Sequence, residues 1–409
     1  MDPFRFGTGC SVEQLAYVGL AAENVRRSDS IGVVDTTPGS AAFGQVVGRV
    51  ELPHGPNRLL RFGWNVCGPR GCRHAPRPSE GRRYLVVPGT TSSRIHLVDT
   101  QPDPKAPRLV TVIDDADEMR RTGYCAPQHY AHDIAWHLGH GTMITSESAR
   151  PDVLEHGVSS KLLVDGEHGR WLHVWDARTR AHRQAIDLGG GQRMVLRLEP
   201  AHNPMRAYGF ASVMFSLVDL SASVFLWYLG RDAAGGRGEW KAQRVITLRA
   251  RPADPTRLPP LLRELRVVPP LVTDIRLSAD DQSLWVSCWG TGEMRRYDVA
   301  DPFNPVLAGV VRLGGIVRRA AHPASPDVGR NGGPQMIDMS HDGRRVYVTN
   351  ALHTHWDRQF YPDGIRGWMA KVDARANGRL ELDPSFFVEF EDGMRPHQVR
   401  LHAVDCAGN

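Results

Sequence analysis

The side chains best suited to chemistry are histidines, and one pair of them has the spacing of metal ligands. His129 and His132 are three residues apart, Cys125 lies four residues upstream, and His137 and His140 follow. Two imidazoles at this spacing can reach one metal ion from a turn, and imidazole suits Cu, Zn, Fe or Ni. The chain holds eighteen histidines, so an H-x-x-H pair also arises by chance. The spacing alone leaves both interpretations open.

Other candidate groups are weaker. His353 and His355 would lie on the same side of a strand, as a surface pair or as a ligand pair. Cys67 and Cys72 are five residues apart, which is wider than the two-residue gap that holds thiolates on zinc or in a redox pair. Two separate thiols are therefore favoured at these positions. The sequence contains no P-loop, no G-x-S-x-G and no H-E-x-x-H motif, which leaves nucleotide-binding and hydrolase functions without support.

The elements that must position these residues repeat along the chain. Residues 277–287 and 339–349 each read as a strand end, an acidic turn and a second strand. Blade-like units of this kind are predicted near residues 31–60, 83–115, 141–187, 207–248, 272–313 and 335–390. Short strands in groups of four, repeated about every 50 residues, are typical of propeller blades. We therefore predict an all-β fold, a single β-propeller domain over residues 1–409 with six or seven blades.

Composition narrows the range of partners and compartments. The chain has 409 residues, 41% hydrophobic and 23% charged, and its net charge of +5 is scattered, so we expect no nucleic-acid partner. Six cysteines are too few for a disulfide framework in a chain of this length, which favours a reducing compartment. A secretory signal and an apolar stretch of about 18 residues are both lacking, so we expect a cytoplasmic protein with no membrane span.

Several motifs together resemble the selenium-binding protein family. They are Gly63–Cys67, Arg83–Pro88, Thr273–Ser278, Gly332–Ile337, Asp342–Thr349 and Trp356–Asp363. The resemblance covers most of the chain, and it implies a β-propeller, in members studied a methanethiol oxidase activity, and copper bound by histidines. Carried over by position, it implies metal ligands at His129, His132, His202 and His397, with His54, Cys67 and Cys72 as additional candidates.

The chain departs from the family pattern at several functional positions. Leu60 and Arg61 stand where paired histidines precede the Gly-Trp-Asn motif, Thr291 replaces another histidine, and Gly44 falls at or beside the cysteine linked to selenium. After residue 167 the chain lacks most of a blade that the family normally carries. These losses affect the histidine set more than the scaffold, which is the pattern of a diverged or inactive relative.

Three functions remain to be compared. The first, which we slightly favour, is a copper-dependent oxidase that converts a small thiol, O2 and water to an aldehyde, H2O2 and sulfide. The second is a non-catalytic propeller that binds a partner protein or a small molecule on one face, because fold does not imply activity. The third, direct selenium binding through a cysteine, is weaker because Gly44 stands near the position of the required thiol.

Overall fold

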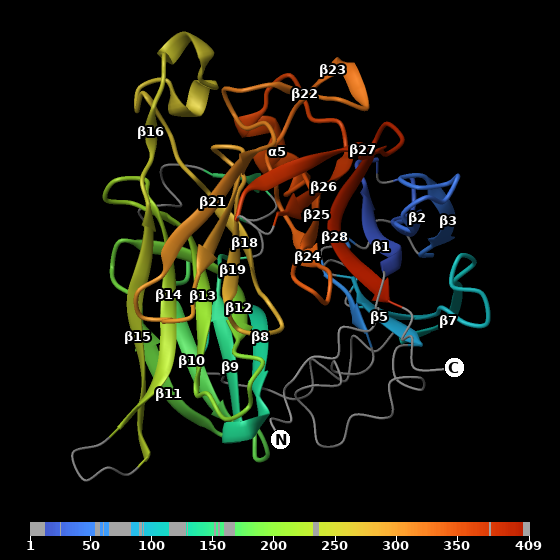
Figure 1. The fold of residues 1–409 in the computed structure, drawn as a ribbon. Coiled ribbons are helices and arrows are strands. Elements are labelled where there is room, and N and C mark those ends of the chain that lie inside the picture. Colours follow the sequence, from blue (N-terminus) through green and yellow to red (C-terminus); the bar gives the residue numbers. More distant parts are fainter. Residues whose placement is uncertain are drawn as a thin grey trace.

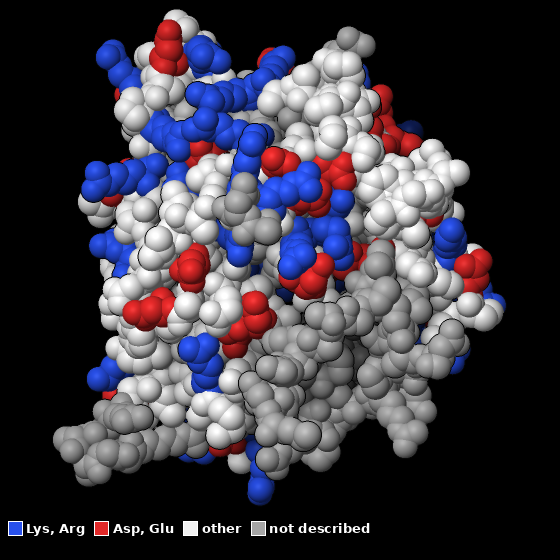
Figure 2. All heavy atoms as spheres, in the orientation of Figure 1, with Lys and Arg blue, Asp and Glu red and all other residues white. Residues whose placement is uncertain are grey.

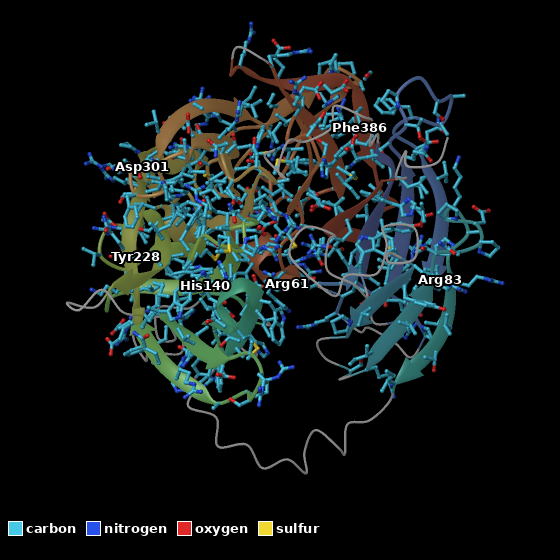
Figure 3. All side chains as sticks on the ribbon, turned by 60° about the horizontal axis from the view of Figure 1, so that its bottom comes forward. Arg61, Arg83, His140, Tyr228, Asp301 and Phe386 are labelled. Carbon is cyan, nitrogen blue, oxygen red and sulfur yellow. The ribbon has the colours of Figure 1, made fainter. Side chains whose placement is uncertain are left out.

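The computed structural model describes residues 13–24, 26–53, 58–59, 61–64, 83–89, 92, 94–113, 128, 130–150, 153, 156–158, 168–231, 237–375 and 378–403. Within these ranges the chain forms six four-stranded sheets arranged around a common axis (Figure 1). Figure 3 places Arg61 near the centre of this ring and Arg83 and Asp301 toward its rim. The predicted all-β propeller is confirmed, and the number of blades is six.

Each sheet is one blade, whose strands follow one another from the centre of the ring outward. Blade 1 consists of β28 (Met394–Ala403), β1 (Glu13–Ala22), β2 (Ser30–Asp35) and β3 (Val46–Glu51), and blade 2 of β4 (Gly63–Trp64), β5 (Tyr84–Pro88), β6 (Ile95–Asp99) and β7 (Arg108–Ile113). Blade 3 consists of β8 (Ala131–His137), β9 (Thr142–Glu147), β10 (Trp171–Asp176) and β11 (His182–Asp187), and blade 4 of β12 (Gln192–Pro200), β13 (Tyr208–Ser216), β14 (Ala222–Arg231) and β15 (Arg237–Leu248). Blade 5 consists of β18 (Val272–Leu277), β19 (Ser283–Cys288), β20 (Glu293–Asp298) and β21 (Val306–Arg312), and blade 6 of β24 (Ile337–Met339), β25 (Arg345–Thr349), β26 (Trp368–Ala374) and β27 (Leu380–Glu389).

Apolar side chains fill the spaces between neighbouring blades. Val272 and Ile275 of blade 5, for example, belong to one buried cluster with Phe210 and Val224 of blade 4. Comparable clusters join blades 1 and 2, 3 and 4, 5 and 6, and 6 and 1. Among the described residues no such cluster joins blade 2 to blade 3. At the other five junctions, neighbouring blades thus bury apolar faces against each other, as alternating strands require.

Blade 1 closes the ring by combining the two ends of the chain. β28 pairs antiparallel with β1, with Val18 opposite Val399 and Tyr17 opposite Arg400. The unit predicted near residues 31–60 contains β2 and β3 but neither β1 nor β28. Because Val18 and Val399 are 381 positions apart in the sequence, their pairing leaves no local pattern there.

Several short elements lie at one end of the ring (Figure 1). They are β16 (Arg251–Pro252), η2 (Pro255–Arg257), η3 (Pro260–Leu262), β17 (Val267–Val268), β22 (Ala320–His322), β23 (Ser325–Arg330) and α5 (Thr354–Phe360). The short η1 (Leu138–His140) instead follows the far end of β8. Leu258 and Leu262 of the segment between β16 and β17 belong to the same buried cluster as Trp356 and Phe360 of α5. The segment between β16 and β17 thus contributes to the cover over one end of the ring.

The charged surface is mixed in sign. Figure 2 shows basic side chains gathered toward the end that carries β16, with acidic side chains interspersed over the rest of the visible face. In the described part of the chain, no helix has both the length and the apolar character needed to cross a membrane.

Candidate functional site

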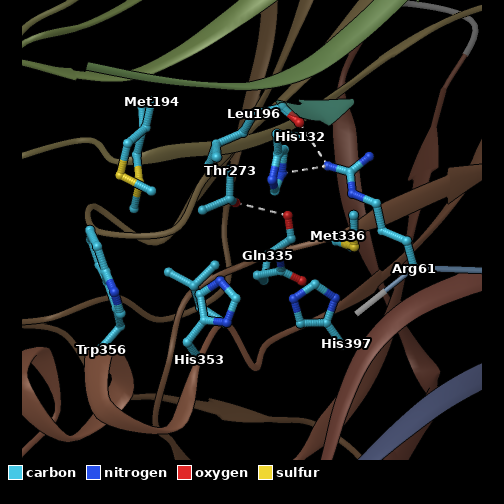
Figure 4. Close-up of a pocket in the computed structure, with 12 residues that line it drawn as sticks. Arg61, His132, Met194, Leu196, Thr273, Gln335, Met336, His353, Trp356 and His397 are labelled. Carbon is cyan, nitrogen blue, oxygen red and sulfur yellow. Dashed lines mark hydrogen bonds between the residues drawn. The ribbon is translucent and has the colours of Figure 1, made fainter. Parts of the chain in front are cut away.

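A small pocket lies in the centre of the ring, where the inner strands of the blades begin (Figure 4). Its lining residues are Arg61, His132, Met194, Leu196, Met214, Thr273, Gln335, Met336, Leu352, His353, Trp356 and His397. The space at its centre is about that of one water molecule. A ligand that enters without rearrangement must therefore be very small.

The propeller topology explains why residues so distant in sequence meet here. His132 is the second residue of β8, Thr273 the second of β18, and Met194 the third of β12, while Met336 directly precedes β24. Because the innermost strand of every blade starts at the same end of the channel, the first residues of these strands converge. His353 comes from outside a blade, at the N-cap of α5, where its side chain makes no capping hydrogen bond and lies on the pocket.

Two of the pocket imidazoles are held in the neutral form. Burial, with a contribution from the charge of Arg61, lowers the pKa of His132 to about 3. Burial, with a contribution from Arg395, lowers the pKa of His353 to about 3 as well. The ring centroids of His353 and His397 lie 5.9 Å apart. Neutral imidazoles keep a nitrogen lone pair, which is the form that binds a metal ion.

Arg61 occupies one of these lone pairs. Its Nη2 donates to His132 Nε2 over 3.2 Å and to the carbonyl oxygen of Leu196 over 2.7 Å, while Nη1 pairs with Asp133 Oδ1 over 2.9 Å. A guanidinium group can only donate, so His132 Nε2 must be the acceptor. This nitrogen can bind a metal only after Arg61 moves.

The pocket also contains an unusual amount of sulfur. Met194, Met214 and Met336 all line it, and each is at most 2% exposed. Met194 adopts a left-handed backbone conformation, with φ of 63°, next to a bulge in the pairing of β12 with β13. Such strain in a non-glycine residue often accompanies functional sites. Thioether and imidazole are the ligands that suit Cu(I).

The structure brings only some of the predicted metal ligands to the pocket. His132 and His397 line the pocket, but His202 does not. Its imidazole Nε2 lies 3.1 Å from the carbonyl oxygen of Leu277, and the side chain is exposed. His202 follows the far end of β12, and at about 3.3 Å per residue it lies roughly 20 Å beyond Leu196. The structure therefore does not bring His202 together with His132 and His397 in this pocket.

The remaining candidates fall outside the described residues. These are His129, His54, Cys67 and Cys72. Within the described ranges, no group of three or more His, Cys, Asp or Glu side chains is arranged to hold a metal ion. The residues present fit a soft ion only when thioether sulfurs join the imidazoles.

Next to the pocket, the channel is lined by an ion-pair layer. Its members are Arg61, Asp133, Arg197, Glu199, Asp274, Arg276, Asp338 and Arg400. Glu199 is central, because it pairs with Arg197 at 2.6 Å and with Arg276 at 2.8 Å. Burial opposes its ionisation, but these two guanidinium groups outweigh burial and hold the pKa of Glu199 below its ordinary value.

Inner-strand side chains of this region also tie blades together. Oδ2 of Asp133 accepts the backbone N–H of Leu198 in the next blade, and Oδ2 of Asp274 accepts that of Ile337, each over 2.9 Å. Asp338 makes the same contact with Leu401 of β28, also over 2.9 Å. Each carboxylate thus satisfies a backbone donor of the neighbouring inner strand. This repeated contact sets how the beginnings of the inner strands, and hence the pocket residues, face one another.

Comparison with known proteins assigns the chain to a family. The model of the 56-kDa selenium-binding protein family matches residues 7–134 and 126–409. The chain belongs to the selenium-binding protein family. A methanethiol oxidase of Xenopus tropicalis is 30% identical over 471 residues, covering 97% of this chain and 95% of the relative. Selenium-binding protein 3 of Arabidopsis thaliana is 27% identical, and the match covers 97% of this chain and 93% of that protein.

A member of the selenium-binding protein family with a solved structure shares the whole fold. The X-ray structure of a hypothetical selenium-binding protein from Sulfolobus tokodaii is 38% identical, covers 98% of this chain and 96% of its own, and has a TM-score of 0.88. The family resemblance predicted from the sequence motifs is confirmed. Of the departures from the family pattern, Arg61 lies in the pocket, whereas Gly44 and Thr291 lie outside its lining.

Sequence reasoning did not place most of the pocket residues of this family member in one site. Met194 and Met214 are buried apolar side chains with no distinguishing pattern. His353 was noted only as half of a pair with His355, which is exposed and lies 6.2 Å from His156 between ring centroids. Three of the family motifs carried a signal, because Gly332–Ile337 contains Gln335 and Met336, Thr273–Ser278 contains Thr273, and Trp356–Asp363 contains Trp356.

Proposed function

We propose that this protein oxidises a small thiol in the central pocket, with copper as cofactor. The proposal rests on one observation: neutral imidazoles and three buried thioethers border the same water-sized space. The names of relatives, methanethiol oxidases about 30% identical, support the substrate class. The reaction would convert thiol, O2 and water to an aldehyde, H2O2 and sulfide.

The chain's own residues would divide the work. His353 and His397, with the neighbouring thioethers, would hold the copper, which would supply a route for electrons from sulfur to dioxygen. Met194, Met214 and Trp356 would enclose the alkyl group and exclude water, which limits the substrate to the smallest thiols. Arg61 would keep His132 Nε2 occupied as a hydrogen-bond acceptor, so His132 could bind copper only if Arg61 were displaced.

The experiment compares two histidines on the same short segment. His353→Ala should lower both bound copper and peroxide release from methanethiol by more than the roughly 10- to 100-fold lost when an outer partner of a metal is removed. His355→Ala, two residues away and exposed, should retain both. Equal copper content and turnover in the two variants, or wild-type protein that binds no copper, would refute the assignment.

One observation favours a second function, a non-catalytic binding platform. Arg61 already holds His132, and the described residues offer no three-ligand site of the usual side chains. Stoichiometric copper with peroxide production would eliminate this alternative. Selenium binding has less support: Cys288, the cysteine within the described ranges, is buried, and burial raises the pKa of its thiol to about 12.

A further inference from the structure

Gln335 carries a buried hydrogen-bond acceptor at the pocket. Its side chain is 2% exposed and lines the pocket together with His353 and His397 (Figure 4). Within the described part of the chain, no donor lies within hydrogen-bonding distance of Gln335 Oε1. A buried carbonyl oxygen without a donor is costly, so it requires an explanation such as a bound water or ligand.

The backbone at Gln335 is fixed from several sides. Its N–H donates to the carbonyl oxygen of Thr349 over 2.7 Å, and its own carbonyl oxygen accepts the hydroxyl of Thr273 over 2.8 Å. Just before it, a Cβ added to Gly333 would lie 1.9 Å from the carbonyl oxygen of Trp289, so the chain passes too close for a larger residue. The carboxamide therefore starts from a rigid position at the pocket.

The remaining pocket wall defines what can meet this oxygen. Met194, Met214 and Leu196 provide apolar surface, and the Arg61 donors described above are directed to His132, Leu196 and Asp133. The central space is about that of one water molecule. A matching ligand combines a single donor hydrogen with a small apolar or sulfur-containing body.

We propose that Gln335 Oε1 accepts the S–H or O–H hydrogen of the small ligand in the pocket and so orients it. This inference rests on the proposed function, under which the ligand is a small thiol and the donor is its S–H group. A water molecule has the same donor chemistry, and the two sources are separated by the experiment.

The test measures binding without turnover. Full-length protein is titrated anaerobically with methanethiol, which has an S–H group, and with dimethyl sulfide, which has none. The wild type should prefer methanethiol, and Gln335→Met should reduce the ratio of the two affinities by about 3- to 10-fold, the effect of one hydrogen bond. Comparing ratios between variants cancels the difference in ligand size. Gln335→Glu keeps an acceptor and should retain the preference.

Gln192 provides a matched control. Its Oε1 is also buried without a donor among the described residues, but it lies outside the pocket lining, so Gln192→Met should keep the wild-type ratio. An unchanged ratio in Gln335→Met, an equal change in Gln192→Met, or a crystal structure with methanethiol in which Gln335 binds only water would overturn the inference. Wild-type protein that keeps the preference but produces no peroxide would refute the oxidase and leave the role of Gln335 intact.

Discussion

The pocket and the ion-pair layer are neighbours in one channel, yet they are built from opposite kinds of side chain. The pocket has thioethers, neutral imidazoles and aromatic surface, whereas the ion-pair layer has four arginines and four carboxylates that pair with one another. Along β18 the two regions are adjacent, because Thr273 lines the pocket and the next residue, Asp274, belongs to the ion-pair layer. The arrangement separates the part that fixes the ring from the part that can hold a ligand.

The strongest test of this separation is removal of the central carboxylate of the ion-pair layer. Glu199→Gln leaves Arg197 and Arg276 without their shared partner, and breaking a buried pair should lower the free energy of unfolding by about 3–5 kcal/mol. Urea denaturation at pH 7 measures it. Asp187→Asn, which breaks the more exposed pair with Arg170, should cost a small fraction of that loss. Equal losses would contradict a structural role for the layer.

Acid should weaken the ion-pair layer through protonation of Glu199. Because the folded-state pKa of Glu199 lies below the ordinary value of 4.5, the native state binds fewer protons than the unfolded state as pH falls past that value. The stability contributed by Glu199 is present at neutral pH and is lost as pH drops through the folded pKa. Unfolding free energies between pH 7 and pH 3 should fall less steeply in Glu199→Gln than in the wild type. Parallel curves would show that Glu199 is not the responsible group.

Arg61 joins the two regions, and its removal should affect both. Arg61→Met frees His132 Nε2 and removes a positive charge from the pocket, so affinity for copper should rise by about tenfold. The free energy of unfolding should fall by only about 1–3 kcal/mol, because Asp133 would still pair with Arg197 and accept the backbone N–H of Leu198. Chelator competition and urea denaturation provide the two measurements. Arg83→Met, at an exposed pair with Asp99, is the control and should leave copper affinity unchanged.

The smallest expected change in stability concerns sulfur in the pocket. Met336→Leu keeps the volume but removes the thioether, so it should cost less than about 1.5 kcal/mol of stability while weakening the binding of Cu(I). Met339→Leu, three residues farther along and outside the pocket, should match it in stability and retain wild-type affinity for Cu(I). Equal affinities for Cu(I) in both variants would remove sulfur from the proposed site.

The sequence predicts the outer parts of the blades better than the channel. The unit near residues 272–313 coincides with β18 to β21, because alternation and acidic turns are local patterns. Blade closure by β28 and β1 depends on two distant segments, and the inner strands carry charges that an alternation of apolar residues does not anticipate. β12 shows this clearly, with Arg197 and Glu199 both buried or nearly so.

The site was harder to predict because a residue's position along its strand decides whether its side chain reaches the pocket. His202 and Met194 belong to the same stretch of chain, but they lie at opposite ends of β12, and only the end that bears Met194 borders the pocket. A motif specifies residue types and spacing, not which end of a nine-residue strand faces the ligand. His353 could not be distinguished from His355 until α5 placed one inward and the other at the surface.

The pairing of β28 with β1 has a consequence for biosynthesis. His397 and the Arg395 that pairs with Asp357 of α5 both lie on this last strand. A ribosome must therefore synthesise the chain from β1 through β28 before these two strands can pair, and contacts over such a separation form slowly. Copper held by His397 would therefore bind only after β28 has been made and has paired with β1, and removal of β28 would both open the ring and take His397 out of the pocket.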